Sequence, residues 1–321
     1  MKGTINSPQS RTMRRNIMAK GLDQFCRQML LHNAPLKLQN DQPAMGRFYP
    51  TQCNQSEAGN GDLFVRFSGV GYAHTNVTKK LTFTMSGAVQ YNQDFQIADE
   101  ECDMYAYFRP RQVASSDFKI NKIEQPTASF FSQLTPMGDD FGKQLVSGKL
   151  REGFTVIKDH EDHDEVAMGM VELGKKPQRA MAVGTDGRVS YENGRVEVHQ
   201  NQRDFVGPIE VTENGRAIFL TAQVDGGVPV DVFVMNQRDA NVALQQYLEI
   251  PQVQALATQP QWADVIPAQM PGFRRTIPVP AGLYYVIFDN SAAAGTVSPP
   301  NNPLDDRAAL VDYAIQLGEA P

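Results

Sequence analysis

Long apolar stretches are missing from this sequence of 321 residues, and so is any excess of basic residues. No run of about 18 apolar residues occurs, which is the length that a membrane-spanning helix needs. Lys and Arg total 30 against 36 Asp and Glu, for a formal net charge of −6. Binding to phosphates needs clustered Lys and Arg, so nucleic acid is not an expected partner. A hydrophobic content of 41% predicts a globular protein. The length of 321 residues is enough for two domains.

The common local signatures of catalysis are absent too. The sequence contains neither a GxSxG nucleophile elbow nor a glycine-rich phosphate-binding motif. Glu192, His199 and Asp204 are spread along the chain with no motif that unites them. We therefore expect no catalytic residue and no cofactor. A hydrolase stays open as an alternative, because all-β enzymes often lack a local motif.

The stretch DHEDHDE, residues 159–165, is the cluster that most resembles a set of metal ligands. His160, Asp162 and His163 are residue types that hard or borderline ions accept. An EF-hand loop, however, needs glycine at its sixth position, where this stretch has Asp164. Consecutive residues at the tip of a hairpin also point in different directions. We expect a solvated acidic tip and no bound metal.

Cysteine is scarce, with three residues at Cys26, Cys53 and Cys102. They form no CxxC motif and have no histidines at zinc-site spacing. In an oxidising compartment we expect Cys53 to pair with Cys102, since both lie near the ends of predicted strands, and Cys26 to stay free in a helix. Three reduced cysteines fit the sequence equally well.

The N-terminal region predicts a helix. Residues 1–16 are polar and lack the apolar core of a signal peptide. This fits a cytoplasmic protein, or an exported or lipid-anchored one whose leader has been removed. Within 13–31, Met18, Leu22, Phe25 and Met29 share one helical face. The basic residues around them would allow contact with an anionic membrane, but docking on the protein's own body is favoured.

The region after residue 61 changes to an alternating pattern that predicts strands. Leu81, Phe83 and Met85 alternate with hydroxyl side chains, which is typical of a strand with one buried face. Aromatic residues recur in these strands: Phe64, Phe67, Phe83, Phe95, Tyr105 and Phe108. They would either fill a core, which is favoured, or enclose a small hydrophobic ligand beneath a short helical lid at residues 128–150.

Turn signals punctuate the second half of the chain. Residues 154–158 and 165–173 predict the two strands of a hairpin. Asx-Gly pairs, the strongest short-range hairpin signals, follow at residues 186, 193, 214 and 225. Such spacing is typical of sandwiches and barrels. We place a domain boundary near Arg203, which divides the chain into residues 1–45, 46–203 and 204–321.

Two strand sequences in the last third carry a resemblance to known modules. VDVFV (230–234) is followed by a short helical piece with Tyr247 and then by PAGLYYVIFDN (280–290). This order resembles β-sandwich modules of the GOLD type and of the bacterial prepeptidase C-terminal type, over about residues 205–297. The resemblance implies a sandwich with a binding or accessory role in secreted and membrane-associated proteins. It carries no catalytic residue.

The fold expected from the sequence is therefore mainly β, with an N-terminal helix followed by two β-sandwich-like domains. The expected function is that of a non-enzymatic binding or scaffolding protein in the periplasm or at the cell surface. Its partner would be a protein or a cell-envelope component. A carrier of a hydrophobic ligand and a hydrolase are the alternatives.

Overall fold

The computed structural model describes thirteen ranges of the chain: 7–14, 16, 25–37, 42–58, 60–75, 78–98, 103–125, 154–158, 166–169, 188–225, 227–269, 272–299 and 307–321. Within them the chain is mainly β, as predicted, and its strands form three antiparallel sheets. The predicted lid at 128–150 and the hairpin tip at 159–165 lie outside these ranges. In the described part of the chain, no helix combines the length and the apolar character needed to cross a bilayer.

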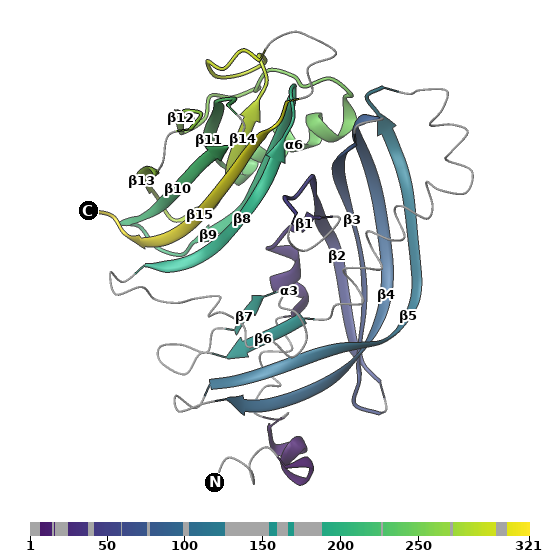
Figure 1. Ribbon diagram of the computed structural model, residues 1–321. Helices are drawn as coiled ribbons and strands as arrows, with labels where there is room; N and C mark the ends of the chain where they lie inside the picture. The colour runs from purple at the N-terminus through teal and green to yellow at the C-terminus, as the bar shows by residue number, and fades with distance from the viewer. Residues whose placement is uncertain are drawn as a thin grey trace.

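The first region is one seven-stranded sheet whose strands follow one another in chain order. Its strands are β1 (Ala34–Leu36), β2 (Gly46–Glu57), β3 (Leu63–Thr75), β4 (Lys79–Ala98), β5 (Asp103–Ile123), β6 (Phe154–Lys158) and β7 (Val166–Gly169). The pairing of β6 with β7 confirms the predicted hairpin. A sandwich was expected here, but the described strands make a single sheet. Its long strands β4 and β5 curve round beneath β6 and β7 in the view of Figure 1.

One face of this sheet carries an apolar core. The alternation predicted on β4 is confirmed, because Leu81, Phe83 and Met85 are all buried. Glycines make room for the rings, and a Cβ at Gly71 would lie 2.4 Å from the ring of Phe83. The helix α3 (Phe25–Leu30) packs its Cys26 and Met29 against the same cluster. The described part of the N-terminal helix therefore docks on the protein's own body.

The disulfide of the structure joins Cys26 to Cys53, with 5.2 Å between their Cα atoms. The predicted pairing of Cys53 with Cys102 is therefore wrong, and so is the free Cys26. The reason is tertiary: α3 packs along β2, which brings two cysteines 27 residues apart into bonding range. Cys102 lies outside the described residues.

The second region is a sandwich of two four-stranded sheets with strand orders β13-β10-β15-β8 and β12-β11-β14-β9. Its elements are β8 (Val189–Val198), β9 (Gln202–Val211), β10 (Arg216–Asp225), β11 (Val230–Asn236), α6 (Gln237–Glu249), β12 (Trp262–Ile266), β13 (Phe273–Val279), β14 (Gly282–Asn290) and β15 (Ala309–Glu319). The sandwich thus begins at β8, and the predicted boundary at residue 203 falls inside β9.

The turn signals of this region have mixed outcomes. Gly215 has a φ of +84° between β9 and β10, so the predicted turn at Asn214-Gly215 is confirmed. The predicted turn at Asn193-Gly194 is wrong, because both residues lie inside β8 and pair with β15. That pairing brings the end of the chain back across more than a hundred residues, and it overrides the local turn preference.

The stretch PAGLYYVIFDN supplies the central strand β14, which pairs with β11 on one side and β9 on the other. Its two faces are both buried, as predicted. Tyr284, Val286 and Phe288 belong to the core between the two sheets, whereas Tyr285 and Ile287 belong to a second cluster on the outer face.

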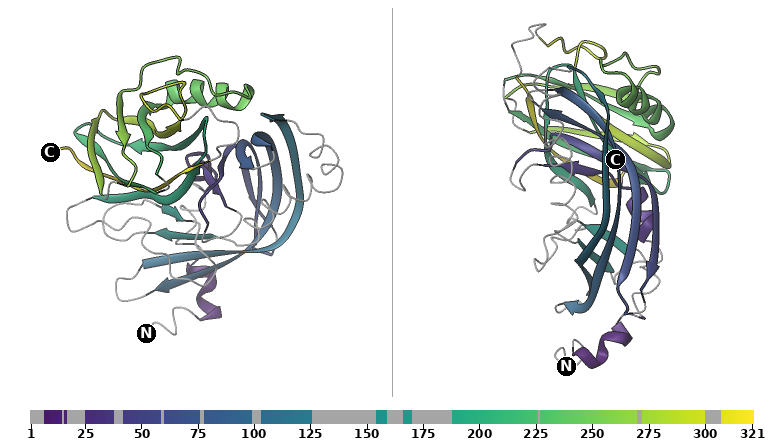
Figure 2. Two further views of the ribbon diagram at one scale, coloured as in Figure 1. Left: turned by 45° about the horizontal axis from the view of Figure 1, so that its top comes forward. Right: turned by 90° about the vertical axis from the view of Figure 1, so that its right-hand side faces the viewer.

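That second cluster joins the two regions. Tyr49 and Tyr72 of the seven-stranded sheet pack there against Phe205, Tyr285 and α6. The views of Figure 2 show β2 and β3 meeting the sandwich near one end while the remainder of the large sheet extends away. The backbone adds to the joint, since Ala44 N–H donates to Arg195 O at 2.8 Å and Glu197 N–H donates to Ala44 O at 2.9 Å.

Candidate functional site

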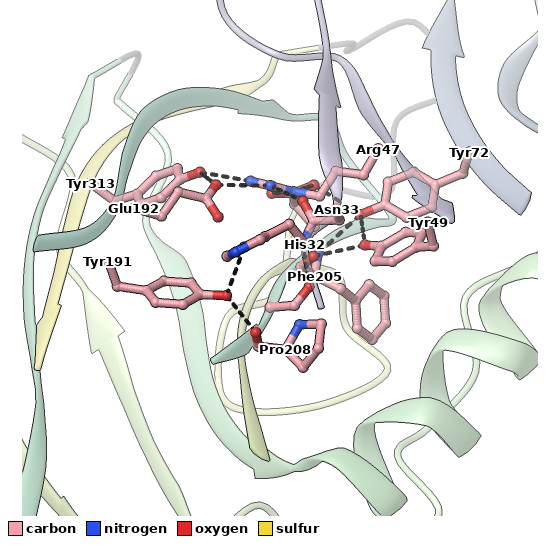
Figure 3. Close-up of polar contacts among 12 residues, drawn as sticks. His32, Asn33, Arg47, Tyr49, Tyr72, Tyr191, Glu192, Phe205, Pro208 and Tyr313 are labelled. Carbon is pink, nitrogen blue, oxygen red and sulfur yellow. Dashed lines mark hydrogen bonds and ion pairs between the residues drawn. The ribbon is translucent and has the colours of Figure 1, made fainter. Parts of the chain in front are cut away.

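The most concentrated polar chemistry in the described residues surrounds Arg47 at this joint (Figure 3). Arg47 comes from β2 and is 0% exposed. Its Nε donates to both carboxylate oxygens of Asp204, at 2.8 and 2.9 Å. Nη1 donates to Glu192 Oε1 at 3.0 Å and to Asn33 Oδ1 at 2.6 Å. Nη2 donates to the hydroxyl of Tyr313 at 2.8 Å.

The fold explains why one arginine reaches so many partners. Strand alternation turns Phe48 into the core of the large sheet and Arg47 toward the sandwich. Glu192 and Tyr313 come from one sheet of the sandwich and Asp204 comes from the other. The guanidinium therefore binds both sheets of the sandwich at once, and the planar fork of arginine is suited to such multiple contacts.

A ring of tyrosines closes the network on the side of the large sheet. Tyr72 donates its hydroxyl proton to Asp204 Oδ1 at 2.8 Å and accepts from the backbone N–H of Phe205 at 2.9 Å. Tyr49 donates to the carbonyl of Phe205 at 2.7 Å. Asp204 is thus held by a guanidinium and a phenol, and the edge of β9 is held by two phenols.

Electrostatics favour the charged form of the arginine. Burial alone would lower the pKa of Arg47, but the charge of Asp204, with smaller contributions from Tyr313 and Glu192, raises it well above its usual value. Burial also raises the pKa of Tyr72, and the neighbouring Asp204 adds to that shift. Arg47 stays a cation and Tyr72 stays a neutral donor throughout the usual pH range.

A second arm of the network runs through the segment that links α3 to β1. The hydroxyl of Tyr191 lies 3.4 Å from His32 Nδ1 and donates to the carbonyl of Pro208. Asn33 Nδ2 donates to the carbonyl of Gly207. Burial lowers the pKa of His32, although Glu192 opposes the shift. This arm ties the N-terminal segment to β8 and β9.

The partners of Arg47 also bind one another. Tyr313 donates to the same Glu192 oxygen that Arg47 contacts, at 2.6 Å, so the partners of the arginine are themselves hydrogen-bonded. Asp204 and Arg47 are engaged with each other, and the hydroxyls that they contact belong to Tyr72 and Tyr313. Burial raises the pKa values of both phenols, so both stay protonated. Removing one member of a buried charge pair is costly because the other is left uncompensated.

The residues singled out from the sequence have different fates. His160, Asp162 and His163 lie outside the described residues, as does Cys102. Within the described ranges, no group of three or more His, Cys, Asp or Glu side chains is placed to hold a metal ion.

The aromatic residues considered for a ligand cavity pack in the core of the large sheet. Phe67, Phe83 and Phe108 are buried there, and Phe64 is half-buried. The side chains of Phe95 and Tyr105 lie outside the described part. The packed arrangement favours the filled core over the cavity for the described rings.

Sequence reasoning missed Arg47 and Tyr313, and it left Glu192 and Asp204 without a partner. Arg47 and Tyr313 are 266 residues apart, so no local motif could join them. The available signal was a lone arginine in the stretch GRFYP, where strand alternation predicts an inward or interface position.

The comparisons with known proteins give little. No known protein family matches the chain, and no curated protein matches it. Among solved structures it is similar to the infectious bursal disease virus VP2 subviral particle, at 11% identity with a TM-score of 0.24, over 95% of this chain and 76% of that one. The Gt strain of the same virus matches at 9% identity with a TM-score of 0.19, over 89% of this chain and 83% of that one. These scores are too low to carry an argument.

Proposed function

We propose that the chain is a non-catalytic binding or scaffolding protein of an extracytoplasmic compartment. The sandwich acts as a base that holds the seven-stranded sheet in a fixed orientation toward a protein or cell-envelope partner. The observation that carries the proposal is the buried Arg47 network. The charges of the network hold one region against the other. A fixed contact of this kind suits a protein that presents a surface to a partner.

Two further features support this function. The disulfide between Cys26 and Cys53 is the kind of bond that persists in oxidising compartments and is rare in the cytosol. The strands β4 and β5 are 20 and 21 residues long, or about 65–70 Å at the usual rise per residue. Ser115 and Lys119 on β5 are exposed, so this long hairpin offers surface to a partner.

Site-specific photo-crosslinking in the producing cells tests the proposal. A photoreactive residue at Ser115 or Lys119 should give a discrete adduct. The same residue at Thr221 or Gln223, exposed positions on the sandwich strand β10, should give none. Arg47→Met should weaken the adduct without removing the protein. Adducts of equal yield from both regions, or none from β5, would contradict the presenting role.

Alkylation tests the compartment separately. Protein isolated from its native compartment in the presence of an alkylating agent should carry no label on Cys26 or Cys53. Two alkylated thiols at these positions would contradict the extracytoplasmic assignment while leaving the binding role open.

A further inference from the structure

Two histidines, one from each region, are stacked on each other at the joint. His74 lies near the end of β3, and His199 lies in the turn between β8 and β9. Their ring centroids are 3.6 Å apart, and the ring planes are inclined by 14°. Their exposed fractions are 2% and 6%. Imidazole is the side chain whose charge ordinarily changes between about pH 5 and 8, so the stack puts two such groups into one desolvated contact.

The hydrogen bonds around the stack favour one proton more than two. Glu197 Oε1 lies 2.9 Å from His199 Nε2 and can stabilise a proton there. The side-chain amide nitrogen of Gln202 contacts His74 Nδ1. An amide nitrogen only donates, so His74 Nδ1 must accept and must be unprotonated in this arrangement. A proton on Nδ1 would turn that contact into two facing donors.

Several charged side chains are linked to the stack by contacts. Glu197 on β8 contacts His199. The charges of Glu124, which follows β5, and of Arg203 on β9 act on Lys80 of β4. Lys80 is the cross-strand neighbour of His74 and donates to the carbonyls of Tyr247 and Ile250 at 2.9 Å. Arg203 pairs with Asp289 at 2.5 Å. Burial lowers the pKa of Lys80 to about 8 and raises that of Asp289 to about 6. Neither charge is fixed over the relevant pH range, so histidine variants are needed to separate the effect of the stack from theirs.

The second proton would place two like charges in face-to-face rings 3.6 Å apart. In the separated regions the two rings would lie apart and in water, so both could carry charge in the mildly acidic range where imidazole ordinarily takes up a proton. The closed joint therefore binds fewer protons than the open one as the pH falls. By linkage, the closed joint has its full stability above the pH range in which the second ring would be protonated. It loses stability as the pH falls through that range.

We propose that the His74–His199 stack is an acid-sensitive contact that loosens the joint between the seven-stranded sheet and the sandwich when both rings become protonated. The seven-stranded sheet would be held against the sandwich near neutral pH and would be released when the protein enters a mildly acidic environment. The inference concerns the joint alone and does not depend on the proposed binding role.

Nuclear magnetic resonance of the imidazole carbons in the full chain tests the coupling directly. The two rings should titrate in two steps separated by more than about one pH unit, as interacting sites do. His199→Gln should leave a single step for His74. The matched control, His32→Gln, removes a buried imidazole from the same joint and should leave both steps in place. Two independent titrations in the parent protein would overturn the proposal.

Hydrogen exchange tests the opening. The amide of Phe205 donates across the joint to Tyr72, and that of Glu197 donates to Ala44. After correction for intrinsic rates, both should exchange about tenfold faster at about pH 5.5 than at about pH 7.5. The core amide of Phe288 should change little by comparison.

The double variant His74→Phe/His199→Phe keeps two flat rings without charge, and it should reduce the acceleration to about threefold or less. If this variant does not fold, His74→Gln and His199→Gln alone serve the same purpose. An acceleration equal to that of the parent in the folded variants would overturn the proposal, as would its absence in the parent.

Discussion

The two regions of this molecule bury their apolar residues in different ways. The sandwich encloses its core between two sheets, and its central strand β14 is buried on both faces. The seven-stranded sheet has one continuous apolar face, which is packed against α3 and held there by a disulfide. The first arrangement closes a core with sheets alone. The second needs a helix, a covalent bond and a neighbouring domain.

Buried polar groups set the orientation at the contact between the two regions. Some buried ionisable groups of the described chain lie inside one region, such as Asp62 in the large sheet and Asp231 in the sandwich. Another group lies where the two regions meet. Arg47, Lys80, His74 and Asp204 all lie there. Apolar packing is not directional, whereas hydrogen-bonded charges are, so a joint built with them sets one orientation of the large sheet.

Truncation of the sandwich core is expected to have one of the two largest effects. Phe288→Ala removes a fully buried ring and should lower the free energy of unfolding by about 3–5 kcal/mol. Denaturant titration measures the change, with Thr221→Ala, at an exposed position of β10, as the control, which should fall within about 0.5 kcal/mol of the parent. A melt of Phe288→Ala that stays within about a degree or two of the parent would mean that β14 is not a core strand.

Breaking the joint should cost a similar amount. Arg47→Met leaves Asp204 buried and without its cation, and we expect a loss of about 3–5 kcal/mol. Adding Asp204→Leu removes the stranded charge, so the double variant should recover part of that loss. Denaturant titration of the two single variants and the double variant measures the coupling. Strictly additive losses would show that the two side chains do not act as a pair.

Loss of the disulfide should act on one region more than the other. Cys26→Ser with Cys53→Ser opens a loop of 27 residues and should cost about 2–4 kcal/mol. Hydrogen exchange should show the loss in β2 and β3, while β14 keeps its protection. Equal loss of protection in both regions would contradict this difference, because it would mean that the stability of the sandwich depends on the large sheet.

A pH effect of smaller size should come from Lys80. Burial lowers the pKa of Lys80 to about 8 from the usual 10.5, against the pull of Glu124. Above about pH 8 the unfolded chain therefore holds more protons than the folded one, so stability should rise as the pH increases toward 9. Thermal melts between about pH 7.5 and 9 measure the rise, and Lys80→Met should abolish it. The measurement stops below the pH range in which the tyrosines of the unfolded chain ionise. Burial raises the pKa values of Tyr72 and Tyr247 in the folded protein, so in that range the stability falls as the pH rises.

The β character of the chain and much of the sandwich could be predicted from the sequence, because they depend on neighbouring residues. The alternation from Ile218 to Val224 sets a strand with one buried face, and the apolar run from Leu283 to Phe288 sets a strand buried on both. The turn at Asn214-Gly215 follows from the backbone freedom of Gly215, which sits at a φ of +84°.

Only the tertiary structure decided the disulfide, the extent of the sandwich and the joint. Cys26 reaches Cys53 because α3 packs on β2. Asn193-Gly194 lies within a strand because β15 returns to pair with β8. Arg47, Asp204 and Tyr313 meet across 266 residues of sequence. In each case the deciding contact joins residues that are distant along the chain, and local patterns hold no information about which distant strand will arrive beside them.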